Sequence, residues 1–256
     1  MWTIRRIIRT VDRTIKRHGV VGSALHVATA VAGRVRRRGA ANGDDTTHHH
    51  HHHEEERVSE DVEQDIDFDT KYGVSTGGEI AQTELDVKEK NWIHGSAYVP
   101  TSPVAFAKVL ADLDLKVEDT TFMDLGSGKG RVLLMAASLP WKRIIGVEFS
   151  PSLADLSRDN IRKYTGPKQC ADLSVETADA TKYPFPSGPL LVFMYHPFDE
   201  TIMAAVAASL TRSLESTPRS IHVLYFKPVH REVWDQAPAF KLRRDTPLYA
   251  LYENRA

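Results

Sequence analysis

The sequence predicts an α/β fold with a mostly parallel sheet, and three observations lead to that prediction. An apolar strand expected at 121–125 runs into a turn with glycine at every second position, and a helix with an apolar face is expected at 131–138. From there on, strand-like and helix-like segments alternate, as they do in parallel sheets with helical crossovers. Two closing strands, expected at 240–244 and 248–252, are joined by a short turn and therefore form an antiparallel hairpin.

The glycine turn is the segment around which the rest is organised. Asp124 ends the expected strand, and Gly126, Gly128 and Gly130 follow it. Glycine adopts positive φ readily and lets a ligand approach the backbone, and the helix behind the turn presents unpaired N–H groups. Strand, glycine turn and helix together indicate the first unit of a nucleotide-binding α/β fold.

Caps and apolar runs predict the other elements. Ser102 with Pro103 begins a helix to residue 113, and Ser150 with Pro151 begins another to Tyr164. Further strands are expected at 143–149, 173–177, 190–195 and 219–226, and further helices at 200–210, capped by Asp199, and at 230–234.

Acidic residues end or follow two of these strands. Glu148 lies near the end of strand 143–149, about 20 residues after the glycines, where a carboxylate can accept both hydroxyls of a ribose. Asp179 closely follows strand 173–177. The alternatives are a capping or surface glutamate for Glu148 and a surface aspartate for Asp179.

Composition suits one sizeable domain with an extension. Of the 256 residues 41% are hydrophobic and 26% are charged, which is ordinary for a soluble protein. The single cysteine, Cys170, excludes an intramolecular disulfide, suits a reducing, cytoplasmic compartment and is expected to be an inert thiol. No metal site is expected, because His94 has no partner at metal-ligand spacing.

Charge divides the chain into an extension at 1–40, a linker at 41–66 and a domain at 67–256. Residues 1–40 carry ten Lys or Arg and one acid, whereas residues 41–70 carry eleven acids and one base. The linker also holds six consecutive histidines and cannot build a core. Residues 71–256 carry 22 charges of each sign, so the domain lacks the basic field that favours nucleic acid.

The residue pattern of the extension predicts a basic amphipathic helix. Over residues 3–17, isoleucine and valine fall on one helical face and arginine and lysine on the other. Three interpretations stay open: a helix bound peripherally to an anionic membrane surface, a helix packed on its own domain or on a protein partner, and an organelle transit peptide. Its uncharged run is too short to span a bilayer.

Six short segments carry a resemblance to a known family. They are 68–78 (F-D-x-x-Y-G-V-x-T-x-G), 91–98 (N-W-x-x-G-x-x-Y), 124–131 (D-L-G-S-G-K-G-R), 146–151 (G-V-E-x-S-P), 196–200 and 228–230. With them, residues from about 68 to 253 resemble bacterial class I S-adenosylmethionine-dependent methyltransferases. The glycine segment is also similar to that of histone-lysine methyltransferases of the telomeric-silencing type.

The resemblance implies a Rossmann-like, seven-stranded fold that binds S-adenosylmethionine. It assigns Gly126, Ser127, Gly128 and Gly130 to the methionine part, Glu148 to the ribose, and Asp179 with Ala180 to the adenine. Asp124 and an aromatic and hydroxyl segment with Tyr98 and Thr101 complete the cofactor site. That segment is expected as a lid, with a surface packing loop as the alternative.

The resemblance places the acceptor and catalytic site at Tyr195, His196, Pro197 and Phe198. His196 stands where the family usually has asparagine, and it is expected to position the acceptor or to take a proton from it. The motifs do not identify the acceptor; a protein lysine or a small molecule is favoured. The rival hypotheses are a cofactor-binding module without catalysis and a nucleic-acid methyltransferase.

Overall fold

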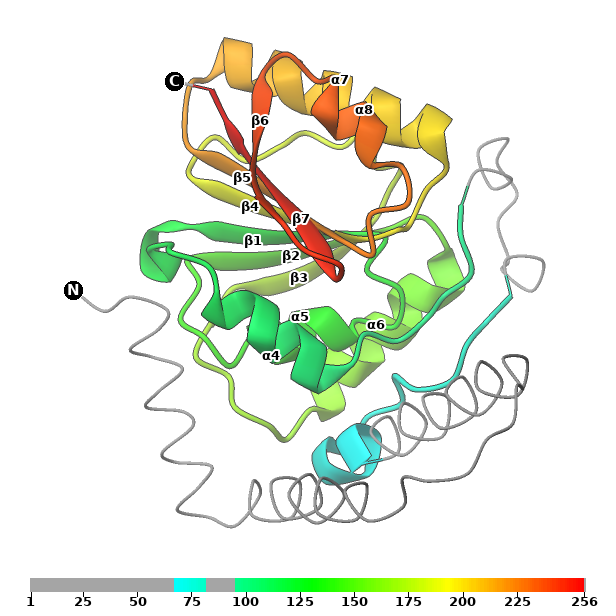
Figure 1. Cartoon of the computed structure of the whole chain (residues 1–256). Helices are drawn as coiled ribbons and strands as arrows, with labels where there is room; N and C mark the ends of the chain where they lie inside the picture. The colour runs from blue at the N-terminus through cyan, green and yellow to red at the C-terminus, as the bar shows by residue number, and fades with distance from the viewer. Residues whose placement is uncertain (1–66, 82–94, 256) are drawn as a thin grey trace, which may run out of the picture.

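The computed structural model describes residues 67–81 and 95–255, which form one sheet between two layers of helices (Figure 1). The expected basic helix at 1–40, the linker at 41–66 and residues 91–94 of the aromatic loop lie outside the described residues. Nothing in the structure therefore bears on the interpretations of the extension.

The sheet has seven strands in the order β3-β2-β1-β4-β5-β7-β6. The five strands β1 to β5 are parallel, and β7 is antiparallel to both β5 and β6. Their bounds are β1 Thr121–Leu125, β2 Arg143–Glu148, β3 Leu173–Thr177, β4 Leu190–Tyr195, β5 Ile221–Phe226, β6 Phe240–Asp245 and β7 Tyr249–Asn254. The predicted mostly parallel sheet with a C-terminal antiparallel hairpin is confirmed.

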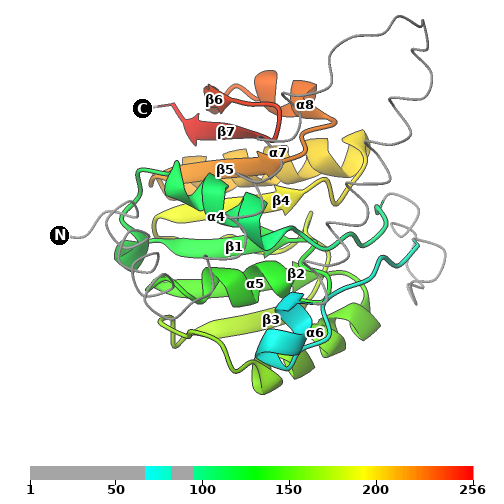
Figure 2. The same cartoon turned by 60° about the horizontal axis from the view of Figure 1, so that its bottom comes forward.

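Helices cover both faces of the sheet. Three lie on one face: α4 (Pro103–Ala111), α5 (Arg131–Ala136) and α6 (Pro151–Lys163); α7 (Glu200–Ser216) and α8 (Arg231–Asp235) lie on the other (Figures 1 and 2). A short 3₁₀ helix, η4 (Val117–Asp119), precedes β1. No helix among the described residues is long and apolar enough to cross a membrane.

The two faces of the sheet carry separate hydrophobic cores. Because successive strand residues point to opposite faces, Phe122 of β1 packs with α4 and α5, while Met123 and Leu125 pack with α7. All five residues of β1 are buried. This double burial explains why the central strands read as continuous apolar runs instead of alternating ones.

Helix boundaries follow the predicted caps at their starts and differ at some ends. The side chains of Ser102, Ser150 and Asp199 each accept a backbone N–H at the first turn of α4, α6 and α7. Helix α7 runs six residues beyond the predicted end at Leu210, because Leu214 continues its apolar stripe against the sheet. Helix α5 ends earlier than predicted, at Ala136.

The topology creates one crevice where a ligand can enter. Strand β1 pairs with β2 on one side and with β4 on the other, so the chain order reverses between β1 and β4. In open α/β sheets, ligands bind outside the carboxyl ends of the strands at this switch point. The glycine turn after β1 and the loop after β4 both lie at this edge of the sheet.

Candidate functional site

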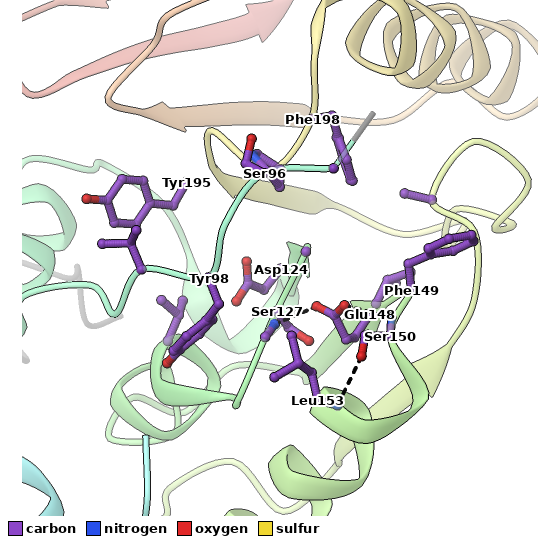
Figure 3. A pocket seen from close by; sticks show the side chains of 18 of the residues that line it. Ser96, Tyr98, Asp124, Ser127, Glu148, Phe149, Ser150, Leu153, Tyr195 and Phe198 are labelled. Carbon is purple, nitrogen blue, oxygen red and sulfur yellow. Dashed lines mark hydrogen bonds between the residues drawn. The ribbon is translucent and has the colours of Figure 1, made fainter. Parts of the chain in front are cut away.

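A pocket lies at the carboxyl ends of β1, β2 and β4 (Figure 3). Figure 3 shows the carboxyl groups of Asp124 and Glu148 between Tyr98 on one side and Phe149 on the other. Of the residues assigned from the sequence, these line the pocket: Tyr98, Thr101, Asp124, Gly126, Ser127, Gly128, Glu148, Asp179, Ala180, Tyr195, Pro197 and Phe198. Gly130 and His196 do not line it.

The backbone of the glycine turn has a conformation and a closeness of packing that only glycine allows. Gly128 has φ 53°, and a Cβ there would lie 2.3 Å from two ring atoms of Tyr98. Gly130 has φ 84° and faces away from the pocket, where a Cβ would lie 2.2 Å from the Oγ of Ser157 on α6. The first of these glycines therefore lets Tyr98 cover the turn, and the second lets α6 pack close to the turn.

Glu148 is held by the backbone of the glycine turn. Its Oε2 accepts the N–H of Gly128 at 2.7 Å, and its Oε1 accepts the N–H of Ser150 at 2.9 Å. Each carboxylate oxygen has a second lone pair, so this anchoring leaves acceptor capacity for a ligand. The side chain therefore has a fixed place at the pocket wall before any ligand arrives.

Two carboxyl groups share this buried wall. Burial, and then the charge of Glu148, raise the pKa of Asp124 well above its usual value. Burial also raises the pKa of Glu148, against the opposing effect of the N–H groups that it accepts. Two acids held in this way favour a ligand that brings positive charge, since a cation stabilises their ionised forms.

One buried side-chain oxygen of the turn has no hydrogen bond among the described residues. It is the Oγ of Ser127, a residue that lines the pocket. A buried hydroxyl without a partner costs about 1–3 kcal/mol. A ligand with a polar group at this point would remove that cost.

The residues expected from the sequence to hold the adenine form a smaller, polar part of the pocket. Asp179 Oδ1 accepts the N–H and the hydroxyl of Thr181, and Oδ2 lies 3.1 Å from the ammonium of Lys182. Burial acts to raise the pKa of Asp179, but these partners together lower it. Phe149 lines the pocket nearby and offers a flat apolar surface, which sequence reasoning did not assign.

Residues 67–78 form a strap over the glycine turn, and sequence reasoning gave them no role. Asp69 Oδ1 accepts the hydroxyl of Thr76, and Thr76 Oγ1 accepts the Nε–H of Arg131, which is only 1% exposed. Tyr98 donates its hydroxyl to the carbonyl of Thr76 at 2.6 Å. The strap therefore fixes both α5 and the tyrosine that covers Gly128. The sequence did carry a signal, a charged Arg131 heading an otherwise apolar helix.

The end of β4 forms the opposite wall of the pocket. Tyr195, Pro197 and Phe198 line it, and the loop at 95–98 joins it through a bridge from Gly95 to Phe198 and an N–H bond from Ser96 to the Pro197 carbonyl. Residues 95–99 and Thr101 of the loop that was expected as a lid line the pocket between the glycine turn and β4.

His196 lies outside the pocket, unlike its neighbours. Its backbone is left-handed, with φ 42°, and its Nδ1 lies 3.1 Å from the phenol oxygen of Tyr225 on β5. The turn in the backbone directs the imidazole toward β5, while Tyr195 and Pro197 face the pocket. The structure therefore does not place His196 where an acceptor wall was expected.

No cluster of metal-ligating side chains occurs among residues 67–81 and 95–255. The chemistry of the site instead suits S-adenosylmethionine. The cationic groups of this cofactor can lie beside the buried acids Asp124 and Glu148, and its ribose can donate to the fixed carboxylate of Glu148. One of its polar groups can form a hydrogen bond with Ser127 Oγ.

Comparison with known proteins yields one family match. Residues 86–180 match the family model described as histone methylation protein DOT1. No curated protein matches the chain.

Solved structures resemble the chain at low identity. A predicted N6-adenine-specific DNA methylase from Listeria monocytogenes is 15% identical, with TM-score 0.45 over 61% of this chain and 51% of that one. A methyltransferase from Aquifex aeolicus is 16% identical, with TM-score 0.46 over 58% and 88%. An RNA methyltransferase from Salinibacter ruber is 19% identical, with TM-score 0.41 over 60% and 92%. The chain spans about half the length of the first structures that it matches.

The family match covers Gly126, Ser127, Gly128, Glu148 and Asp179, which all line the pocket. Over residues 86–180 the chain is therefore similar to the family described as histone methylation protein DOT1.

Proposed function

We propose that this chain catalyses transfer of the methyl group of S-adenosylmethionine to a nucleophilic atom of an acceptor that enters beside Tyr195 and Phe198. One observation carries the proposal: a single pocket is lined both by the glycine turn with Glu148 and by the loop after β4. A protein that only bound the cofactor would not need a second, aromatic wall at the switch point.

The cofactor supplies a methyl group activated by a sulfonium, so the chain needs to bind, orient and exclude water. In this proposal Gly126 and Gly128 let the methionine part lie against the backbone, and Ser127 donates to it. Glu148 accepts the ribose hydroxyls. Asp179 and Ala180 hold the adenine, and Asp124 faces the positive end of the ligand.

The acceptor side of the proposal rests on the β4 loop. Pro197 fixes the backbone after β4, and its Cβ would lie 2.4 Å from a Cβ placed on Gly126, so the two walls of the pocket touch. Tyr195 and Phe198 are then the side chains that contact the acceptor. The enclosure excludes water from the reacting atoms.

A protein amine and a small molecule both suit a narrow aromatic wall of this kind. Nucleic acid suits it less well, because residues 71–256 carry equal numbers of positive and negative charges. The acceptor is therefore best sought among proteins and metabolites before RNA or DNA.

The test begins with calorimetric titration of the full chain with S-adenosylmethionine. A lysate of the source organism lacking this gene is then labelled with tritiated-methyl cofactor and the pure chain, and separated into protein, nucleic acid and small molecules. Label in one fraction that disappears with Phe198→Ala supports the proposal. Cofactor binding without label in any fraction would favour a non-catalytic binding module.

A further inference from the structure

Strand β4 ends at a backbone turn that separates the two faces of the sheet. Its last residue, Tyr195, packs against the core on the side of α4 and α5. The next residue, His196, has φ 42° and is one of two non-glycine residues with positive φ in the described part of the chain. Such backbone carries strain and persists only where its surroundings hold it. The contacts of His196 therefore have to keep it in this conformation.

A buried hydrogen bond on the other face of the sheet does so. Tyr225 of β5 is fully buried in the core on the side of α7 and α8, and its phenol oxygen lies 3.1 Å from His196 Nδ1. The same oxygen accepts the backbone N–H of His230 at 3.2 Å. The phenol proton then needs an acceptor, and His196 Nδ1 is the one that the described residues supply.

The surroundings also keep the imidazole able to accept. Burial, and then the neighbouring His230, lower the pKa of His196. A neutral ring that accepts through Nδ1 carries its own proton on Nε2. The hydrogen bond between Tyr225 and His196 therefore fixes both the tautomer and the direction of the side chain.

The residues that follow His196 build one wall of the pocket. Pro197 comes next, and its Cβ would lie 2.4 Å from a Cβ placed on Gly126. The carbonyl of Pro197 accepts the N–H of Ser96, and Phe198 forms a bridge with Gly95. The direction in which the chain leaves β4 thus decides where Pro197 and Phe198 lie. Because His196 sets that direction, a contact outside the pocket fixes the wall.

We propose that the hydrogen bond between Tyr225 and His196 positions the acceptor wall of the pocket from the opposite face of the sheet. The two are positioning residues, and neither contacts the cofactor or the acceptor. His196 acts by accepting the phenol proton of Tyr225, not by taking a proton from the acceptor. This role rests on the proposed methyl transfer, which gives the wall with Pro197 and Phe198 its function.

Three substitutions isolate the hydrogen bond. Tyr225→Phe removes the donor and keeps the ring. His196→Leu removes the acceptor, whereas His196→Asn has nearly the shape of leucine and carries an amide oxygen that can accept in place of Nδ1. Tyr252→Phe is the matched control, because Tyr252 is also fully buried and donates its hydroxyl, but to Asp235 and away from the pocket.

The first measurement needs no acceptor. In the full chain saturated with S-adenosylhomocysteine, amide hydrogen exchange followed by nuclear magnetic resonance reports the bond from the Ser96 N–H to the Pro197 carbonyl. Tyr225→Phe and His196→Leu should speed the exchange of Ser96 at least about tenfold, while His196→Asn and Tyr252→Phe should not. Tyr225→Phe should add nothing in a chain that already carries His196→Leu, because the hydrogen bond is then absent.

The second measurement is methyl transfer per folded molecule into the lysate fraction that the wild-type chain labels. Tyr225→Phe and His196→Leu should transfer about tenfold less label, with nearly wild-type affinity for S-adenosylmethionine. His196→Asn should retain most of the transfer that His196→Leu loses. Tyr252→Phe should lower the melting temperature without lowering transfer per folded molecule.

The positioning role and the proposed function can fail separately. Absence of label in every fraction with the wild-type chain would overturn methyl transfer, and Ser96 exchange would still decide whether the hydrogen bond holds the wall. Unchanged Ser96 exchange in Tyr225→Phe and His196→Leu would overturn the positioning role alone, as would equal transfer by Tyr225→Phe and Tyr252→Phe. Equal loss of transfer in His196→Asn and His196→Leu would also overturn it, because the imidazole itself would then act in the reaction.

Discussion

The two walls of the pocket are built in different ways. The wall at the ends of β1 and β2 consists of backbone at positive φ and of acids held by backbone N–H groups, such as Glu148. The wall at the end of β4 consists of the side chains of Tyr195, Pro197 and Phe198.

This difference in construction separates recognition of the cofactor from recognition of the acceptor. A wall of backbone and fixed carboxylates recognises a ligand that stays the same, whatever the acceptor is. A wall of side chains can be changed one residue at a time without disturbing the sheet. We therefore expect substitutions at the first wall to affect cofactor affinity, and substitutions at the second to affect turnover.

The largest effect is expected at the glycine turn. Gly128→Asp places a Cβ 2.3 Å from the Tyr98 ring at a backbone angle that side chains rarely adopt. Cofactor binding should fall below detection in calorimetry. Gly188→Asp is the control, because its nearest neighbour is the end of a lysine side chain at 3.8 Å. Equal affinity in the two variants would remove the glycine turn from the site.

A smaller loss is expected from Glu148→Ala. This change removes the acceptor for the ribose and leaves the N–H groups of Gly128 and Ser150 without their carboxylate. The expected loss of cofactor affinity is about 1–3 kcal/mol. Glu118→Ala, an exposed glutamate in η4, should bind as the wild type does. Unchanged affinity in Glu148→Ala would contradict the ribose assignment.

The buried acids predict an unusual dependence of stability on pH. Because burial and Glu148 raise the pKa of Asp124, the folded chain binds this proton more tightly than the unfolded chain does. Its contribution to stability is therefore fully present below the unfolded pKa and is lost as pH rises through the folded pKa. Thermal melts of the ligand-free protein should show that Asp124→Asn gains stability relative to wild type as pH rises. Parallel curves would mean that Asp124 is not coupled in this way.

The smallest effect is expected from loss of the hydrogen bond between Tyr98 and the strap. Tyr98→Phe removes the hydroxyl bond to the Thr76 carbonyl but keeps the ring over Gly128. Stability to urea should fall by about 0.5–1.5 kcal/mol, with cofactor affinity nearly unchanged. Tyr183→Phe removes a hydroxyl that has no hydrogen bond to the described residues, so this variant should fall within about 0.5 kcal/mol of wild type. A large loss of affinity in Tyr98→Phe would show that the hydroxyl itself contacts the ligand.

Sequence reasoning predicted the fold correctly, because the helix caps and apolar runs of the sequence agree with the burial of the residues in the structure. Ser102, Ser150 and Asp199 cap the helices predicted from them, and every predicted strand is present. The end of α7 was missed, because continuation past Leu210 depends on the packing of Leu214 against the sheet, a tertiary contact with no local stop signal.

Sequence reasoning predicted only part of the candidate site. The glycine spacing and Glu148 follow from a local pattern, whereas the partners of His196 do not. The contact of His196 with Tyr225 joins two strand ends. The direction of the His196 side chain depends on a positive φ that the neighbouring residues do not predict. The contacts of Arg131 with Thr76 Oγ1 and with Asp69 Oδ1, which it pairs with at 3.4 Å, were hidden for the same reason, since the partners lie more than fifty residues apart.

The most direct test of the two-wall account compares cofactor affinity and methyl transfer in the same preparations of wild type, Glu148→Ala and Phe198→Ala. The account predicts that Glu148→Ala weakens binding of S-adenosylmethionine. It predicts that Phe198→Ala binds with nearly wild-type affinity but transfers at least about tenfold less label per folded molecule. Full transfer by Phe198→Ala, with the folded fraction measured by thermal melting, would contradict the account and leave Phe198 as a packing residue under α7.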